Sequence, residues 1–169
     1  TQLCKPHESN KIMWELHNSI NSKKDKDELL LAQKEIRRSI KHPDLSSFMK
    51  ILITGGAGFI GFNCALILKE RGYKNIHIFD NFEKGYRPDL ENFTTIHRGD
   101  LSKSEDLTKC LSSESFDGIL HFGAQTAVTT SIKDPRRDFE TNALGTFNLL
   151  ESVRKTCPKA KIIYSSSNK

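Results

Sequence analysis

Three glycines at regular spacing, Gly55, Gly58 and Gly61, follow a short apolar run in the first half of the chain. The run, residues 51–54, predicts a buried parallel strand, and the apolar positions after the glycines have helical spacing. In a strand–glycine–helix unit the glycines allow a tight exit from the strand, close approach of the backbone to a pyrophosphate, and close packing of helix on strand. The N–H groups at the start of the helix also favour an anion. The spacing therefore predicts a phosphate-binding loop.

An acidic residue ends the next predicted strand. Residues 75–79 are mostly apolar and are followed by Asp80, 19 residues after Gly61. A carboxylate at this place can accept hydrogen bonds from both ribose hydroxyls of NAD, and it repels the 2′-phosphate of NADP. We interpret the two features together as a dinucleotide site that prefers NAD. The alternative, a loop aspartate beside a structural glycine turn, stays open at this point.

From Met49 onwards the sequence alternates between strand and helix patterns. The strands are expected at residues 51–54, 75–79, 94–97, 118–122 and 161–164. Alternation with short connections implies right-handed crossovers, and so a Rossmann-type, doubly wound parallel α/β sheet with strand order 3-2-1-4-5. The ligand crevice should lie at the carboxyl ends of the strands, around the first and the fourth.

The helices between these strands have recognisable ends and apolar faces. Gly72 is expected to cap the first at its C-terminus, Ser102 and Glu105 to form a capping box for the second, and Asp134 with Pro135 to begin a long third helix. The expected buried positions, in chain order, are Ile60, Ala65, Ile67 and Leu68, then Leu107 and Leu111, then Phe139, Ala143, Thr146, Leu150 and Val153.

Residues 1–48 differ in character from the remainder. A helix is expected from Asp25 to Lys41, because Leu29, Ala32, Ile36 and Ile40 share one face. Met49 resembles a natural start, so we interpret residues 1–48 as a partly helical N-terminal extension of unknown role. A fusion and the tail of an upstream domain are both open. Residues 49–169 are then an NAD-binding Rossmann domain that is incomplete at its C-terminus.

Composition limits the class of protein. A hydrophobic content of 36% and a charged content of 28% suit a soluble globular protein, and no apolar run approaches the roughly 18 residues of a membrane span. We expect a cytoplasmic protein without a membrane segment. The net charge of +5 is spread among acids, which favours a solvated surface over a nucleic-acid groove. The four cysteines lack a CxxC pair and the six histidines lack ligand spacing, so we expect reduced thiols and no metal site.

Four motifs in order resemble the extended short-chain dehydrogenases/reductases, the NAD-dependent nucleotide-sugar epimerases and dehydratases. They are residues 54–61, Asp80-Asn81, Gly99-Asp100-Leu101 and Asn142-x-x-Gly145-Thr146. The resemblance covers residues 49–169. It implies tightly held NAD, a CDP- or UDP-linked hexose as substrate, and a homo-oligomer when the protein is full length. Residues 125–131 and 164–169 are most similar to the branch that inverts C2 of a CDP-linked sugar by transient oxidation to a keto sugar and return of the hydride to the opposite face.

The resemblance also implies a role for each matching position. The pyrophosphate group is held by Gly55, Gly58 and Gly61, with Phe59 and Ile60 between them as further cofactor-binding residues. The adenosine ribose is held by Asp80 and Asn81, and the adenine is bordered by Asp100 and Leu101. The cofactor is further lined by Gly123, Ala124 and Gln125. Asn142 would order the active site, or simply bond a carbonyl inside a helix. The substrate would be faced by Thr130 and Ser131, and the catalytic hydroxyl would be that of Ser167.

The chain departs from the family at the catalytic base. The family uses Tyr-x-x-x-Lys, in which the lysine lowers the pKa of the tyrosine, but Tyr164 is followed by Asn168 at the lysine position. We therefore expect this stretch alone to bind NAD without turnover. A UDP-hexose 4-epimerase and a non-catalytic dinucleotide-binding module remain as alternatives. A 4,6-dehydratase is disfavoured, because it needs Asp-Glu directly after the catalytic Ser/Thr, where this chain has Asn168-Lys169.

Overall fold

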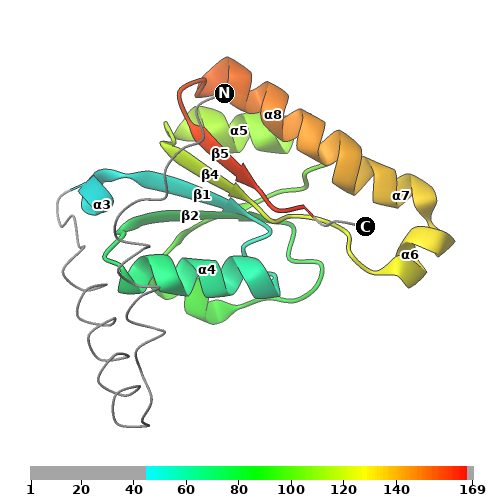
Figure 1. The fold of residues 1–169 in the computed structure, drawn as a ribbon, viewed down its shortest axis with the longest axis horizontal. Coiled ribbons are helices and arrows are strands. Elements are labelled where there is room, and N and C mark those ends of the chain that lie inside the picture. Colours follow the sequence, from blue (N-terminus) through cyan, green and yellow to red (C-terminus); the bar gives the residue numbers. More distant parts are fainter. Residues whose placement is uncertain (1–44, 167–169) are drawn as a thin grey trace, which may run out of the picture. The chain divides into compact units, whose positions relative to one another are not determined.

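A parallel sheet of five strands forms the centre of the computed structural model, which describes residues 45–166 (Figure 1). The strands stand in the order β3-β2-β1-β4-β5. Their bounds are β1 Lys50–Thr54, β2 Asn75–Asp80, β3 Thr95–Arg98, β4 Gly118–His121 and β5 Lys161–Tyr164. The predicted fold class and strand order are confirmed. The helix expected at residues 25–41 lies outside the described residues, as does Ser167.

Helices cover both faces of this sheet (Figure 1). One face carries α4, Phe59–Glu70, and η1, Pro88–Asn92, and the other carries α5, Ser104–Ser113, and α8, Gly145–Thr156. Each interface has its own apolar core: Ile53, Ile78, Ala65 and Leu90 on the α4 face, and Leu52, Phe79, Leu107 and Leu149 on the α5 and α8 face. The central positions of β1 and β4, residues 51–53 and 119–120, are consecutive apolar residues because these strands are covered on both sides.

The strand register brings the strand ends level. Thr54, the last residue of β1, pairs with Phe79 of β2 on one side and with His121 of β4 on the other. The loops that follow these strands therefore leave the sheet at one edge, as expected for a ligand site in an open α/β sheet. The helices α6, Val128–Lys133, and α7, Pro135–Phe139, lie beyond this edge (Figure 1).

The helix α4 faces the sheet through small residues. Gly61 and Ala65 are buried, whereas Ile60 is 59% exposed and Ile67 is 48% exposed, so the expected burial of these two isoleucines is wrong. A side chain at Gly61 would place its Cβ 2.3 Å from the carbonyl oxygen of Gly55. This close approach fixes which side of α4 faces the sheet and turns both isoleucines away from it.

The C-terminal cap of α4 is confirmed. Gly72 has φ of +89°, its N–H donates to the carbonyl of Lys69, and the N–H of Tyr73 donates to that of Leu68. These two bonds are those of a Schellman motif, which needs a left-handed residue just after the helix.

The long third helix is interrupted by a π-helical segment. It begins as predicted at Pro135, with the Asp134 carboxylate accepting from the N–H of Arg137 at 3.0 Å. It then passes through η2, a π-helix at Glu140–Leu144, into α8.

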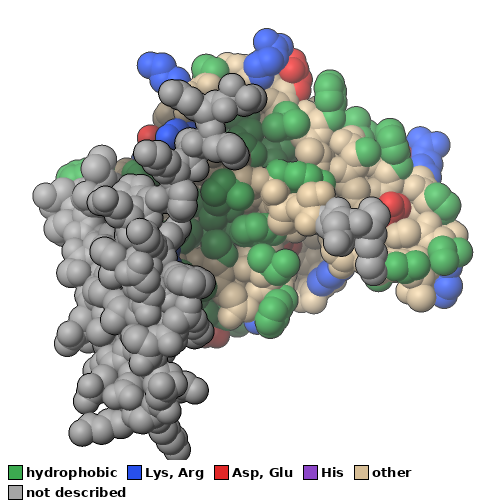
Figure 2. Space-filling model, in the orientation of Figure 1, with side chains coloured by type: hydrophobic (Ala, Val, Ile, Leu, Met, Phe, Trp, Pro, Cys, Tyr) green, Lys and Arg blue, Asp and Glu red, His purple; other side chains and the backbone are tan. Residues whose placement is uncertain are grey.

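The expected buried face of this long helix is largely wrong. Phe139 is 61% exposed, Leu150 is 47% exposed and Ala143 is exposed too, and hydrophobic side chains reach the surface along α7 and α8 (Figure 2). Val153 is buried as expected, and the other residues buried in α8 are Gly145, Leu149 and Ser152. Polar Asp138 and Asn142 take the inward positions of the first half and are held there by hydrogen bonds, so apolar periodicity pointed to the wrong side.

The capping box expected at the second helix is also wrong. The helix α5 begins at Ser104 with Lys103 as its N-cap residue, which makes no side-chain capping bond. The Ser102 hydroxyl instead donates to the Asp100 carboxylate at 2.8 Å, because this charged acceptor lies two residues away in the same loop. The buried positions of Leu107 and Leu111 are confirmed.

The described structure extends a few residues upstream of Met49. The short helix α3, Leu45–Phe48, precedes β1, and the Ser47 carbonyl accepts from the Asn75 side chain at 2.9 Å. The domain boundary at residue 48 stays a prediction. Among the described residues, no helix is long and apolar enough to cross a membrane.

Neighbouring leucines in α8 test its orientation. Leu149→Ala should lower the free energy of unfolding by about 2–5 kcal/mol, because Leu149 is fully buried between α8 and the sheet. Leu150→Ala should cost less than about 1 kcal/mol, because this side chain is half exposed. Urea unfolding followed by circular dichroism measures both values. A larger loss for Leu150→Ala would contradict the observed orientation.

Candidate dinucleotide-binding site

A cavity of about 620 Å³ opens where β1, β2, β3 and β4 end. Its volume lies within the usual range of small-molecule sites. Many of the residues that the sequence selected as cofactor-binding line it: Gly55, Gly58, Phe59, Ile60, Gly61, Asp80, Asn81, Asp100, Leu101, Gly123, Ala124 and Gln125. The structure therefore brings together four motifs that are far apart in the chain.

Other predicted site residues lie outside the cavity lining. Asn142 stands behind it and hydrogen-bonds to the backbone of Gln125. Thr130 and Ser131 lie on α6, where the Ser131 hydroxyl donates to Asp138 at 2.7 Å. Ser167 lies outside the described residues. The substrate and catalytic roles of these four residues stay predictions.

The glycines form a cradle of closely packed backbone in which an added side chain would meet neighbouring protein atoms. Gly55 has φ of +68°, and a Cβ atom there would lie 2.6 Å from the Cα of Gly123. A Cβ at Gly123 would in turn lie 2.6 Å from the Leu101 side chain, and one at Gly58 would lie 3.2 Å from the Gly55 carbonyl. The bare backbone thus lines the floor of the cavity, and a ligand can approach it closely.

The start of α4 offers hydrogen-bond donors to this cavity. The first intrahelical bond runs from the Phe62 N–H to the Gly58 carbonyl at 3.0 Å. The N–H groups of Phe59, Ile60 and Gly61, one turn earlier, have no acceptor within the helix. All three residues line the cavity. Together with the helix dipole, these donors fit a pyrophosphate group.

Asp80 connects two of the cavity walls. One of its carboxylate oxygens accepts from the N–H of Ala57 at 3.0 Å, and the other from the N–H of Phe82 at 2.7 Å. Each carboxylate oxygen can accept a second hydrogen bond, so the group can still bind ribose hydroxyls. Asp80 thus holds the glycine loop to the loop after β2, in addition to the role the sequence predicted.

A second carboxylate in the cavity is stabilised in its charged form. Burial alone would raise the pKa of Asp100, but hydrogen bonds from the Ser102 N–H and hydroxyl and from Asn81 outweigh it and bring the pKa below its usual value. Asp100 is therefore ionised at neutral pH and acts as a hydrogen-bond acceptor in the cavity wall.

A buried chain of hydrogen bonds runs behind the cavity from β1 to the long helix. The position of each proton in this chain follows because each hydroxyl group has one hydrogen to donate. The Thr146 hydroxyl donates to the Asn142 carbonyl at 2.7 Å, so it must accept from His121 Nε2 at 2.9 Å. His121 Nδ1 is then unprotonated, and it accepts a hydrogen bond from the Thr54 hydroxyl at 2.6 Å. Thr54 in turn accepts from the Gly123 N–H at 3.3 Å.

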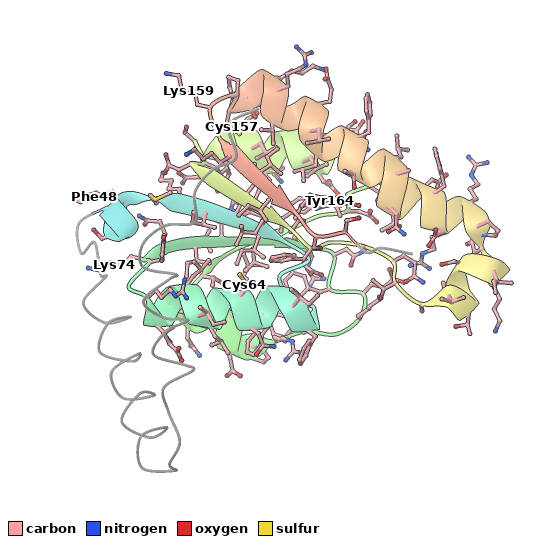
Figure 3. All side chains as sticks on the ribbon, in the orientation of Figure 1. Phe48, Cys64, Lys74, Cys157, Lys159 and Tyr164 are labelled. Atoms are coloured by element: carbon pink, nitrogen blue, oxygen red, sulfur yellow. The ribbon has the colours of Figure 1, made fainter. Side chains whose placement is uncertain are left out.

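His121 is neutral in this chain of bonds. It is 2% exposed, and its ring centroid lies 5.4 Å from that of Tyr164, which is labelled at the end of β5 in Figure 3. Burial lowers the pKa of His121 to about 4. Because both ring nitrogens are engaged, an added proton would break the contact with Thr54.

Asn142 extends the same connection to the cavity wall. Its side-chain oxygen accepts from the Gln125 N–H at 2.7 Å, and its side-chain nitrogen donates to the Gln125 carbonyl at 2.9 Å. Asn142 does bond a carbonyl, as the simpler interpretation held, and that carbonyl belongs to the loop that lines the cavity. Its role in ordering an active site stays a prediction.

Sequence reasoning missed several charged and polar residues of the site. The cavity is also lined by Glu83, Lys84, Arg137, Glu140 and Thr141. Arg137 could have been found, because a helix that follows β4 must begin at the carboxyl edge of the sheet. Thr54 and His121 were detectable as polar residues within otherwise apolar strands.

Thiols and acids elsewhere in the described part of the chain show no metal site. Cys64, Cys110 and Cys157 are free, and burial raises the pKa of Cys110 to about 12. Within residues 45–166 no group of three or more His, Cys, Asp or Glu could hold a metal ion.

The fold and the cavity together define a Rossmann-type nucleotide-binding domain. Residues 52–169 match the family described as GDP-mannose 4,6 dehydratase, and the chain belongs to that family. The resemblance to the extended short-chain dehydrogenases/reductases is thereby confirmed.

Within this family, the chain is similar to several nucleotide-sugar epimerases. The chain is 42% identical over 128 residues to the CDP-paratose 2-epimerase of Salmonella typhi, a match that covers 72% of this chain and 37% of that protein. It is 37% identical over 134 residues to the bifunctional UDP-glucose 4-epimerase and UDP-xylose 4-epimerase 1 of Pisum sativum, covering 73% and 38%. The UDP-glucose 4-epimerase of Thermus thermophilus, solved in complex with NAD, aligns with a TM-score of 0.66 at 34% identity, covering 70% and 38%. The chain thus spans somewhat over a third of these relatives.

The buried His121 predicts a pH-dependent stability. Its pKa is about 6.5 when unfolded and about 4 when folded, so the unfolded state binds the proton first as the pH falls. Its contribution to stability is present above pH 6.5 and is lost towards pH 4, by roughly 3 kcal/mol at most. In urea unfolding at several pH values, the free energy of unfolding of His121→Gln should fall less steeply with falling pH, because the titrating imidazole is absent. The carboxylates titrate in both proteins, so their contribution cancels in the comparison. Parallel curves would contradict the folded-state pKa.

Proposed function

We propose that the protein to which this chain belongs is an NAD-dependent nucleotide-sugar epimerase, and that residues 49–169 contribute its NAD-binding part. The observation that carries the proposal is the cradle of side-chain-free backbone at Gly55, Gly58 and Gly123, beside the start of α4 and the Asp80 carboxylate. These groups match the pyrophosphate and ribose of a dinucleotide. Solved relatives of similar fold contain NAD.

Each part of the cavity has a task in this proposal. The first turn of α4 holds the pyrophosphate, Asp80 with Asn81 the adenosine ribose, and Asp100 with Leu101 the adenine. The hydrogen-bond chain from Thr54 through His121 to Asn142 holds the wall at Gln125. When bound, NAD would supply reversible oxidation of the sugar, which allows one carbon to invert.

For the substrate we propose a CDP-linked dideoxyhexose inverted at C2. This choice is supported by the 42% identity to the Salmonella typhi CDP-paratose 2-epimerase. It is also supported by the similarity of residues 125–131 and 164–169 to that branch of the family. The second candidate is a UDP-hexose 4-epimerase, favoured by the Pisum sativum and Thermus thermophilus relatives. A 4,6-dehydratase is not proposed, although the family bears that name, because Asn168-Lys169 cannot supply its acid.

The ribose contact is tested by cofactor preference. Asp80→Ala should weaken NAD binding by about 10- to 100-fold, because a charged acceptor is lost, and should weaken NADP binding less, because repulsion of the 2′-phosphate is lost as well. Isothermal titration with both dinucleotides gives the ratio. Asp80 also anchors two loops, but disorder of these loops would weaken the binding of NAD and of NADP by the same factor. Asp89→Ala, an exposed carboxylate outside the cavity, is the control. An unchanged ratio would remove Asp80 from the ribose site.

The reaction is tested in the full-length protein with a CDP-linked dideoxyhexose deuterated at C2. Oxidation and return of the hydride to the same carbon should keep the deuterium in the epimerised product, as seen by mass spectrometry. Ser167→Ala should slow the conversion and leave NAD bound. Loss of deuterium to water would refute hydride transfer, and conversion of UDP-glucose in place of the CDP sugar would select the second candidate.

A further inference from the structure

An ion pair joins two walls of the cavity that are far apart in sequence. The Arg137 guanidinium, on α7, contacts the Glu83 carboxylate, in the loop of residues 81–87 that follows β2. Both residues line the cavity. The pair therefore links the wall that carries Asp80 to the helix that follows β4, across the opening between them.

Both partners have their backbones held by neighbouring side chains. The Glu83 N–H donates to the Asn81 side chain at 3.1 Å, and the Arg137 N–H donates to the Asp134 side chain at 3.0 Å. Phe82, beside Glu83, is tied to Asp80 and its side chain is buried. With the backbones fixed, only side-chain freedom is lost when the pair forms, which favours an ion pair even at the surface.

We propose that Glu83 and Arg137 form a latch across the mouth of the cavity that prolongs the residence of a bound dinucleotide. The proposal rests on the dinucleotide site described above. A ligand lying between the first turn of α4 and Asp80 is enclosed on the side where the pair closes. Release then requires the pair to break, whereas the contacts of the ligand itself are unchanged.

A direct contact of Arg137 with a phosphate group gives a different pattern. The described acidic residues of the cavity wall are Asp80, Glu83, Asp100 and Glu140, and the basic ones are Lys84 and Arg137. If Arg137 bound the pyrophosphate, Glu83 would compete for it, and removing the Glu83 charge would tighten binding. In the latch, both partners act in the same direction.

The test measures the release of radiolabelled NAD, chased with unlabelled NAD, from the 169-residue chain. R137Q and E83Q should each shorten the residence time about two- to five-fold, as for an exposed ion pair, and the double variant should shorten it no further. The charge exchange E83R/R137E should restore most of it. Raising the salt concentration should speed release from the wild type more than from the variants.

R154Q is the control. Arg154 is an exposed arginine on α8 that pairs with Glu151 of the same helix, and neither residue lines the cavity, so its loss should leave release unchanged. Slower release from E83Q, or an R137Q effect that E83R/R137E does not reverse, would overturn the latch in favour of a direct phosphate contact. Unchanged release from both single variants would overturn the latch alone. A wild-type chain that retains no NAD would overturn both the latch and the dinucleotide site.

Discussion

The contact between the ends of β1 and β4 controls the geometry of the whole site. Gly55 leaves β1 with a left-handed backbone and approaches Gly123 so closely that neither position accepts a side chain without a clash. Gly61 repeats the constraint, since its Cα lies against the Gly55 carbonyl and so fixes the rotation of α4. Because three backbone segments meet without side chains, the first turn of α4 and the wall after β4 border one space. A methyl group at this junction would separate them.

Polar contacts extend this arrangement to the outer wall. Thr54, His121 and Thr146 form a buried line of alternating donors and acceptors in which every proton has a defined place. Such a line holds its members in fixed orientation, because reversing one bond would leave a buried group unpaired. Asn142 continues the line to Gln125 on the cavity side. The apolar cores hold the layers together, and this line positions the loops within them.

The sequence predicted the parts that depend on local rules. Strand order, the glycine loop of residues 55–61 and the place of Asp80 followed from spacing, whereas Asp100 and Gly123 followed from the family resemblance. Gly72 and Asp134 followed from capping chemistry. The predictions from the sequence were wrong where tertiary contacts determine which side chains are buried. Polar residues take the inward positions in the first half of the long helix, so Phe139 faces out, and in α8 the buried leucine is Leu149, not Leu150. Backbone contact at Gly61 turned Ile60 away from the core and towards the cavity. Arg137 and Glu83 meet only because loops from distant segments converge, which no local pattern reveals.

The π-helical segment η2 makes the length of the long helix as important as its composition. A π turn holds one residue more than an α turn, and such segments are frequent near functional sites. If the same number of residues wound as a regular α-helix through Glu140–Leu144, everything before this segment would rotate by about 100° relative to α8. Arg137 would then leave the cavity side while α8 kept its packing. Loss of one residue at this point would instead let the segment wind as a regular α-helix with both of its ends kept in place, so a related sequence that is one residue shorter here should carry an uninterrupted α-helix.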